Sequence, residues 1–128
     1  MITQAISAVS AYYATAPPAQ LLYGDGPGIL SMNGTGISAI IDWGGVRAGS
    51  AADDIGCWTA HGATDLIPLP AYTAAFLDGY RSSSSLPAAD AVAVPLFQRL
   101  RIASRACYAT SPDALARVEA WTRRAFAA

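Results

Sequence analysis

The sequence predicts an α+β domain that is mainly helical, with about five helices around one small β-hairpin. Apolar residues recur at helical spacing over most of the chain, and Asn33-Gly34 separates two short apolar runs. The chain has 128 residues, of which 53% are hydrophobic and 13% are charged. This length is typical of one domain, and the apolar content is sufficient to stabilise a hydrophobic core. We therefore expect residues 1–128 to form a single domain.

The N-terminal segment is predicted to be an amphipathic helix over residues 2–15. Its apolar positions follow helical spacing, at Ile2, Ile6, Val9 and Tyr13. Pro17 and Pro18 end the helix, because proline lacks the backbone N–H that a helix interior needs.

The predicted hairpin follows a glycine-rich loop at residues 24–28. Its strands span roughly residues 29–32 and 35–42, with Asn33-Gly34 as the turn, because this pair suits the positive φ angles of a type I′ turn. The loop opens a hairpin and not a helix, which excludes a dinucleotide-binding fingerprint.

The rest of the chain is predicted to be helical. Ser50 and Asp53 form a capping box that opens a helix over about 51–60. Pro70 falls in the first turn of the next helix, which places three aromatic residues on one face, Tyr72, Phe76 and Tyr80.

Two further helices complete the predicted domain. Pro87 opens a helix that we expect to be broken or kinked at Pro95. Beyond Pro95 the helix resumes with one stripe formed by Phe97, Leu100 and Ser104. Ser111-Pro112-Asp113 predicts the N-terminal cap of the last helix, which carries Leu115, Val118, Thr122 and Ala125.

Composition limits the partners that the chain is expected to have. The net charge is −1, which gives no electrostatic reason to expect nucleic-acid binding. No apolar run approaches the ~20 residues of a membrane span, and the first residues do not resemble a signal peptide. We therefore expect a cytoplasmic protein that binds neither nucleic acid nor membrane. Cys57 and Cys107 match no metal-ligand spacing and are predicted to be small buried residues.

The basic residues are all arginine, and they are unevenly distributed. Six of the eight lie in the last thirty residues, at Arg99, Arg101, Arg105, Arg117, Arg123 and Arg124. They form either a solvated helical face or a surface for an acidic partner or an anionic ligand.

Two carboxylates are predicted to meet at the open end of the hairpin. If the turn is centred between Asn33 and Gly34, Asp25 and Asp42 are equally distant from it. Two acids beside flexible glycines form a candidate metal or acid/base site. Taken singly, Asp25 is equally typical of a turn residue and Asp42 of a strand end.

Three motifs resemble those of a known enzyme family. The run from Leu22 to Leu30 resembles the H-G-D-x-H-P-G-N catalytic loop of aminoglycoside phosphotransferases and choline-kinase-like enzymes. Ile40 to Trp43 is similar to their V-I-D-W segment, and Gly49 to Ile55 to the G-D-P-x-x-D-L that follows. The later helices, including Phe76 to Tyr80, follow the order of the family's C-terminal helices. The resemblance covers essentially the whole chain and implies a protein-kinase-like C-terminal lobe.

The resemblance assigns a role to each of three aspartates. Asp25 falls on the catalytic aspartate, which positions or deprotonates the acceptor hydroxyl. Asp42 falls on the aspartate that binds Mg²⁺ against the nucleotide phosphates. Asp54 falls on a later aspartate that supports the catalytic loop.

The chain also departs from the family pattern. Tyr23 replaces the histidine before Gly-Asp, and Ile29 or a gap replaces the asparagine that completes the metal site. The nucleotide-binding lobe, with its glycine-rich turn and lysine, is not in these residues. ATP and Mg²⁺ are therefore expected as cofactors only if another chain supplies that lobe.

Three functions remain open from the sequence. The chain is one half of a split phosphotransferase, a repurposed lobe that binds or transforms a small molecule in the former acceptor cleft, or a non-catalytic scaffold. Under each, a homodimer or a partner protein chain is expected to cover apolar surface.

The candidate site residues follow from these hypotheses. The catalytic candidates are Asp25, Asp42 and His61, and Asp42 is also the metal candidate. His61 is equally typical of a helix C-terminal cap or a packed core residue. The substrate-binding candidates are aromatic and suit an apolar pocket as well as a core, namely Tyr23, Trp43, Trp58 and Tyr72.

Overall fold

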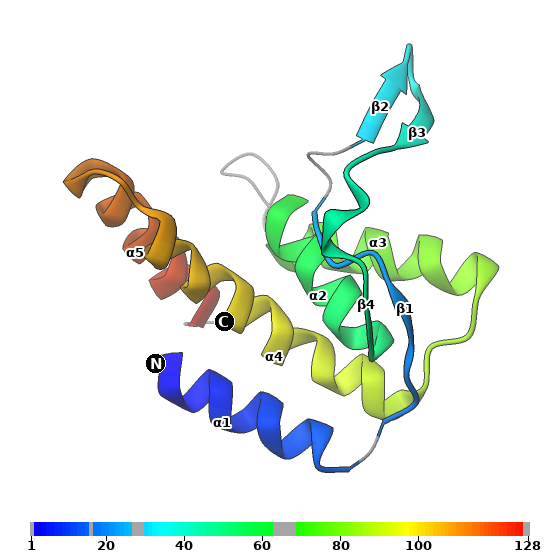
Figure 1. Cartoon of the computed structure of the whole chain (residues 1–128), viewed down its shortest axis with the longest axis horizontal. Coiled ribbons are helices and arrows are strands. Elements are labelled where there is room, and N and C mark those ends of the chain that lie inside the picture. The colour runs from blue at the N-terminus through cyan, green and yellow to red at the C-terminus, as the bar shows by residue number, and fades with distance from the viewer. Residues whose placement is uncertain (1, 16, 27–29, 63–68, 127–128) are drawn as a thin grey trace.

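The computed structural model describes residues 2–15, 17–26, 30–62 and 69–126. These residues form a mainly helical domain with two small β-ladders (Figure 1). The α-helices are α1 (Ile2–Tyr13), α2 (Ala51–Gly62), α3 (Leu69–Ser83), α4 (Ala88–Ser104) and α5 (Pro112–Phe126). The strands are β1 (Gln20–Leu22), β2 (Leu30–Asn33), β3 (Gly36–Ile40) and β4 (Arg47–Gly49), with short 3₁₀ helices η2 (Trp43–Gly45) and η3 (Arg105–Tyr108). The predicted mainly helical class with a small hairpin is confirmed.

The β2–β3 hairpin is present, but its register differs from the prediction. Asn33 pairs with Gly36, so the two turn residues are Gly34 and Thr35, and only Gly34 has a positive φ, at 64°. A bulge between Ser31 and Met32 then shifts the pairing by one further residue. The equal distance of Asp25 and Asp42 from the turn is therefore wrong, because the true centre lies about one residue later and the ladder contains an extra residue.

A second ladder, between β1 and β4, was not predicted. Its antiparallel pairing places Leu22 opposite Arg47, whereas the hairpin ladder ends where Leu30 pairs with Ile40. Two chain segments therefore connect the ladders, one between β1 and β2 and the other between β3 and β4. Asp25 lies in one of these segments and Asp42 in the other.

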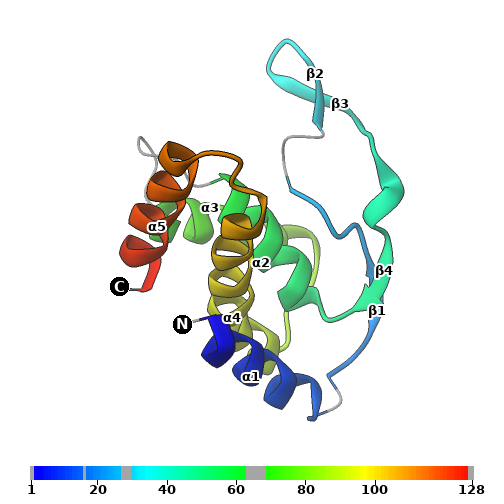
Figure 2. The same ribbon diagram turned by 60° about the vertical axis from the view of Figure 1, so that its left-hand side comes forward.

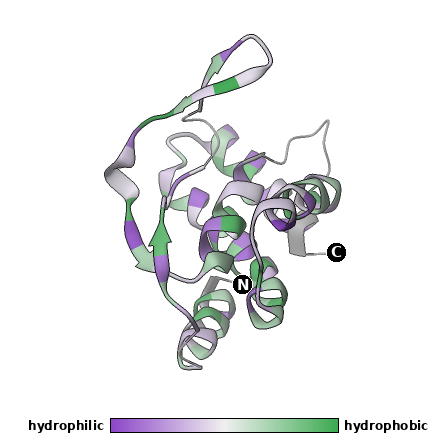
Figure 3. Ribbon diagram, turned by 90° about the vertical axis from the view of Figure 1, so that its right-hand side faces the viewer, coloured by the Kyte–Doolittle hydropathy of each residue, from purple (hydrophilic) through white to green (hydrophobic). Residues whose placement is uncertain are grey.

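The ribbon of strands lies to one side of the helices. Figures 1 and 2 show the β2–β3 hairpin projecting away from the helical body, with β1 and β4 beside α2. Hydrophobic and hydrophilic residues both occur along these strands (Figure 3), and several of the hydrophobic ones are exposed. The exposed apolar face of the ribbon consists of Leu21, Met32, Ile37, Ile40, Ile41, Trp43 and Val46, whose exposed fractions run from 37% to 74%.

The hydrophobic core lies between α2 and α4. It is built from small and branched side chains that let the two helices approach closely, Ala51, Ala52, Ile55, Ala93, Val94 and Phe97. Helices α1 and α3 cover this pair with half-buried residues, Val9 and Tyr12 from α1 and Phe76, Leu77 and Tyr80 from α3. The predicted aromatic face of α3 is therefore directed towards the core through Phe76 and Tyr80.

The predicted break or kink at Pro95 is not observed as an end of the helix. Helix α4 is assigned as one helix from Ala88 to Ser104, with Pro95 inside it. Pro95 is exposed, whereas Val94 and Phe97 beside it are buried in the core. Packing on α2 therefore continues the helix across a residue that cannot complete its hydrogen-bond ladder.

The predicted helix caps are formed in different ways. Ser111 accepts a hydrogen bond from the Ala114 backbone N–H at 3.1 Å, which confirms the cap of α5. Ser50 likewise accepts from the Ala52 N–H at 3.1 Å. The reciprocal half of the predicted box is wrong, because the Asp53 carboxylate instead forms an ion pair with Arg47.

A buried hydrogen-bond network joins three helices. Tyr12 on α1 donates to the Asp90 carboxylate on α4 at 2.5 Å, and the Ser50 hydroxyl before α2 lies 2.5 Å from the same phenol oxygen. Asp90 is only 2% exposed and Ser50 1%. Because Tyr12 gives its one proton to Asp90, Ser50 is the donor to the phenol oxygen. The network fixes α1 against the α2–α4 pair.

The two cysteines differ in their surroundings. Cys57 is buried, as predicted, but Cys107 in η3 is exposed, so the prediction for Cys107 is wrong. Within the described ranges, no helix has both the length and the hydropathy to cross a membrane.

Candidate functional site

Asp54 holds the loop that carries Asp25. The two oxygens of the Asp54 carboxylate accept the backbone N–H groups of Tyr23 and Gly24, each at 2.8 Å. Both amides belong to buried residues, so the carboxylate replaces the water that they have lost. Gly24 has φ of 82°, a left-handed conformation that favours glycine. The expectation that Asp54 supports this loop is confirmed by these contacts.

Asp25 points from this loop towards helix α4. Its Oδ1 accepts the Gly26 N–H at 2.7 Å and lies 3.5 Å from a guanidinium nitrogen of Arg101. The Asp25 side chain is 41% exposed, so ligands can reach it from solvent. Asp25 is thus a positioned, accessible carboxylate with an arginine beside it.

His61, at the end of α2, packs against the same loop. Its Nδ1 lies 2.8 Å from the Cys57 carbonyl oxygen, and this acceptor requires the proton to be on Nδ1. A Cβ added at Gly26 would lie only 2.4 Å from the His61 ring, so only glycine lets the loop approach the imidazole this closely. Burial lowers the pKa of His61, and the charges of Arg105 and Arg101 lower it further, against the raising effect of the hydrogen bond to Cys57. The ring is therefore neutral near pH 7, with Nε2 as an acceptor.

Asp42 lies on the opposite segment and is connected to the loop through Tyr23. The backbone oxygen of Asp42 accepts the Tyr23 hydroxyl at 2.6 Å, and the Ile41 carbonyl accepts it as well. Asp42 itself is exposed and has φ of 62°, an uncommon value for a residue other than glycine. Burial raises the pKa of Tyr23, and the charges of Asp42 and Asp25 raise it further. One tyrosine therefore couples the segments of both aspartates.

Three of the four aromatic substrate-binding candidates pack against one another in one cluster, namely Tyr23, Trp43 and Trp58. The Tyr23 ring lies edge-on to Trp43 at 5.0 Å and to Trp58 at 6.1 Å, measured between ring centroids. Trp58 in turn lies 6.2 Å from Phe76 on α3. Tyr72 lies on α3 without a ring contact to this cluster in the described part of the chain. The cluster supports the loop, and only Trp43 is mainly exposed, at 57%.

The metal candidate lacks partners among the described residues. No group of three or more histidine, cysteine, aspartate or glutamate side chains gathers in these ranges. Asp42 provides one exposed carboxylate, and Ile29, which was expected, unless a gap, to replace the asparagine of the resembled family, lies outside the described residues. Any Mg²⁺ at Asp42 would therefore take most of its oxygen ligands from water or from a bound phosphate.

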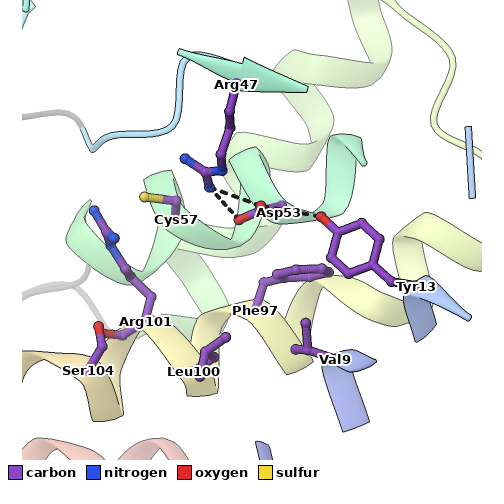
Figure 4. Close-up of a pocket in the computed structure, with 9 residues that line it drawn as sticks. All are labelled: Val9, Tyr13, Arg47, Asp53, Cys57, Phe97, Leu100, Arg101 and Ser104. Atoms are coloured by element: carbon purple, nitrogen blue, oxygen red, sulfur yellow. Dashed lines mark hydrogen bonds and ion pairs between the residues drawn. The ribbon is translucent and has the colours of Figure 1, made fainter. Parts of the chain in front are cut away.

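A pocket of about 360 Å³ lies next to the Asp25 loop, between α1, α2, α4 and β4 (Figure 4). Nine residues line it: Val9, Tyr13, Arg47, Asp53, Cys57, Phe97, Leu100, Arg101 and Ser104. Its volume falls within the range of small-molecule sites. Arg101 belongs both to this pocket and to the ion pair with Asp25, so the pocket and the candidate catalytic loop meet at this side chain.

The sequence predicted only part of the pocket lining. The stripe of Phe97, Leu100 and Ser104 was predicted to share one helix face, and this face lines the pocket. Arg47 was missed because its neighbours are set by the unpredicted β1–β4 ladder. Arg101 and Arg105 stand four residues apart, a spacing that places two cations on one helix face and could have marked this end of the pocket.

Comparisons of the chain with protein families, with curated proteins and with solved structures find no match. The resemblance to aminoglycoside phosphotransferases and choline-kinase-like enzymes thus depends on the motifs around Asp25, Asp42 and Asp54 alone.

Proposed function

We propose that this chain is a phosphotransferase-like C-terminal lobe that binds a small molecule beside Asp25, repurposed from the acceptor cleft of such an enzyme. On its own, the 128-residue chain does not perform ATP-dependent phosphoryl transfer. The proposal is carried by the double hydrogen bond through which Asp54 fixes the Tyr23-Gly24 backbone. A loop held by a carboxylate in this way presents the next residue, Asp25, in one orientation.

The proposed chemistry uses Asp25 and His61 as proton acceptors. The Asp25 carboxylate is accessible, and the His61 ring is neutral with its Nδ1 proton directed to a backbone carbonyl. A ligand hydroxyl at this loop would find a carboxylate oxygen and an imidazole Nε2 that can each accept a hydrogen bond. The site therefore suits a hydroxyl-bearing small molecule, with Asp25 as the group that orients or deprotonates it.

Phosphoryl transfer by the isolated chain is disfavoured by what the residues supply. The chain contains no lysine, and the described side chains do not assemble a metal site around Asp42. Phosphoryl transfer depends on cations that neutralise the nucleotide phosphates. We expect a calorimetric titration with ATP and Mg²⁺ to detect no binding in the micromolar range.

The proposal is tested with a panel of neutral polyols, followed by amide NMR of the 13.2 kDa chain. Binding should shift the amide signals of residues 23–26. Asp25→Asn should abolish these shifts while leaving the fold intact, because it removes only the charge and basicity. Asp78→Asn is the matched control, since Asp78 is 82% exposed on α3. If panel members bind with equal affinity to the wild type and to Asp25→Asn, the proposed role of Asp25 is wrong.

Asp42→Asn distinguishes a site that needs a metal at Asp42 from one that acts without a metal. If the site acts without a metal, this variant should bind panel members about as well as the wild type does. A severe loss that depends on added Mg²⁺ would instead favour a metal at Asp42 and the split-phosphotransferase alternative.

A second candidate function, association with another protein chain, is favoured by the exposed apolar face of the ribbon. Many exposed apolar side chains on one small part of a domain are typical of a protein contact. This surface would suit either half of a split phosphotransferase or a scaffold, and both remain alternatives to the repurposed lobe.

A further inference from the structure

We propose that the pocket beside Asp25 takes a small molecule with one anionic group on an apolar body, that Arg101 holds the anion, and that the charge of Arg105 attracts it from one helical turn beyond the pocket lining. This inference rests on the proposed function, because it names the class of ligand for that same site. It concerns the end of the pocket where α4 passes into η3.

The body of the pocket is apolar. Val9, Phe97 and Leu100 contribute hydrocarbon surface from α1 and α4. Burial raises the pKa of the Cys57 thiol to about 11, so this side chain is uncharged at neutral pH and behaves as a further apolar surface. A ligand that enters must therefore present an apolar portion to these residues.

One arginine of the pocket has its hydrogen-bonding capacity occupied. Arg47 makes two bonds of 2.9 Å to the oxygens of Asp53, and it also donates to the carbonyls of Gly24 and Gly45. The Tyr13 hydroxyl donates to the same carboxylate at 3.3 Å. Arg47 and Asp53 therefore neutralise each other and fix β4 to α2, and neither is available to a ligand (Figure 4).

Arg101 is in a different situation. Its contact with Asp25 is 3.5 Å long, well beyond the 2.7–2.9 Å of a strong charge-assisted hydrogen bond. The guanidinium carries five N–H donors, and the Asp25 contact involves one of its nitrogens. Arg101 thus lines the pocket with donors that its single carboxylate neighbour does not use.

Arg105 adds a second cation one helical turn later. In the described part of the chain it has no ion pair, and its guanidinium lies 4.5 Å from the centre of the Trp121 ring. Burial lowers the pKa of Arg105, and the nearby charge of Arg101 lowers it further. Among the described residues, Arg101 is the one of the two that contacts Asp25, and Arg105 adds a second positive charge near it.

An anion can accept the unused N–H groups of Arg101, whereas an ammonium group offers them no acceptor. A planar carboxylate or a phosphate can accept two parallel hydrogen bonds from a guanidinium. Such a ligand competes with Asp25 for Arg101. Binding therefore releases the Asp25 carboxylate towards solvent and towards any hydroxyl that the ligand carries.

The test uses four probes that share one apolar body and carry no alcohol hydroxyl. They are 4-phenylbutyrate, 4-phenylbutyl phosphate, 4-phenylbutylamine and the neutral 4-phenylbutanamide. Each is titrated into the full chain while the amide signals of Val9, Leu100 and Ser104 are followed by NMR. We expect the two anions to bind at these residues and the amine not to bind. The carboxylate and the phosphate arms show which anion is preferred.

Variants assign the effect to the two arginines and to Asp25. Arg101→Gln should weaken anion binding by about tenfold or more, the cost of losing a hydrogen bond to a charged group. Arg105→Gln should weaken it in the same direction. Arg81→Gln is the matched control, because it removes the same charge from an exposed side chain on α3. Asp25→Asn should strengthen anion binding, since it removes the competing carboxylate.

The outcomes separate this inference from the proposed function. If 4-phenylbutanamide and 4-phenylbutylamine bind in the pocket as tightly as the anions do, and Arg101→Gln does not change the affinity of any probe, the pocket binds small molecules but the anionic ligand class is wrong. If binding of the polyol panel at residues 23–26 fails while the anions still bind, the proposed function fails and the anion site stands. If no probe shifts the pocket residues, the inference is overturned.

Discussion

Removing the charge of Asp54 should destabilise the fold through the loop that carries Asp25. In Asp54→Asn one carboxylate oxygen is replaced by an amide nitrogen, which cannot accept the N–H of Tyr23 or Gly24. One 2.8 Å hydrogen bond is then lost with its buried donor unsatisfied, and the other loses its charge assistance. At about 1.5–3 kcal/mol for a bond to a charged group, the total loss is about 2–4 kcal/mol.

This loss converts into a shift of the melting temperature. With an unfolding entropy of about 2.1 cal/mol/K per residue, 128 residues give about 0.27 kcal/mol/K, so Tm should fall by roughly 7–15 °C. Differential scanning calorimetry measures the shift, and amide hydrogen exchange should show that the Tyr23 and Gly24 N–H groups lose their protection. Asp78→Asn, at a side chain that is 82% exposed, should leave Tm nearly unchanged. If Asp54→Asn melts within about 2 °C of this control, the Asp54 carboxylate does not hold the Tyr23-Gly24 backbone.

Tyr12, the two cysteines and the exposed apolar face of the ribbon each give a further prediction. Burial, together with the hydrogen bond to Asp90, raises the pKa of Tyr12 to about 12. The unfolded chain loses this proton near its ordinary pKa of 10, so the free energy of unfolding should fall as pH rises from 10 to 12, and urea titrations should show a smaller fall for Tyr12→Phe. At pH 8, iodoacetamide should modify Cys107 and spare Cys57, as mass spectrometry of the native chain would reveal; equal labelling of both would contradict the buried position of Cys57. The exposed apolar face of the ribbon should make the chain self-associate at tens of micromolar, and replacing Met32 and Ile37 by serine should reduce this; a clean monomer in light scattering would count against it.

Local sequence signals predicted the helices well. The cap at Ser111, the proline in the first turn of α3 and the apolar spacing of α1 each involve residues within one or two turns of one another. The resemblance also identified Asp54 as the support of the Asp25 loop, a contact across about thirty residues that helical spacing alone does not reveal.

The remaining features depend on long-range or irregular geometry. Strands β1 and β4 have three residues each, which is too short for a periodic pattern, and they pair across the whole hairpin. The bulge after Ser31 changes the register by one residue and carries no sequence signal that separates it from a regular strand. The pocket is assembled from four elements, so Arg47 acquires its role only after the second ladder forms.

The backbone conformation at residue 42 restricts which amino acids fit there without strain. At φ of 62° and ψ of 67°, the backbone favours glycine, asparagine and aspartate, and other side chains add strain of about 1–2 kcal/mol. Asparagine and glycine each differ from aspartate by one base in the codon, and both suit this conformation at least as well. Backbone geometry alone therefore does not account for a carboxylate here. Asp42→Asn therefore removes the charge at this position without adding backbone strain, so an effect of that variant reports on the carboxylate itself.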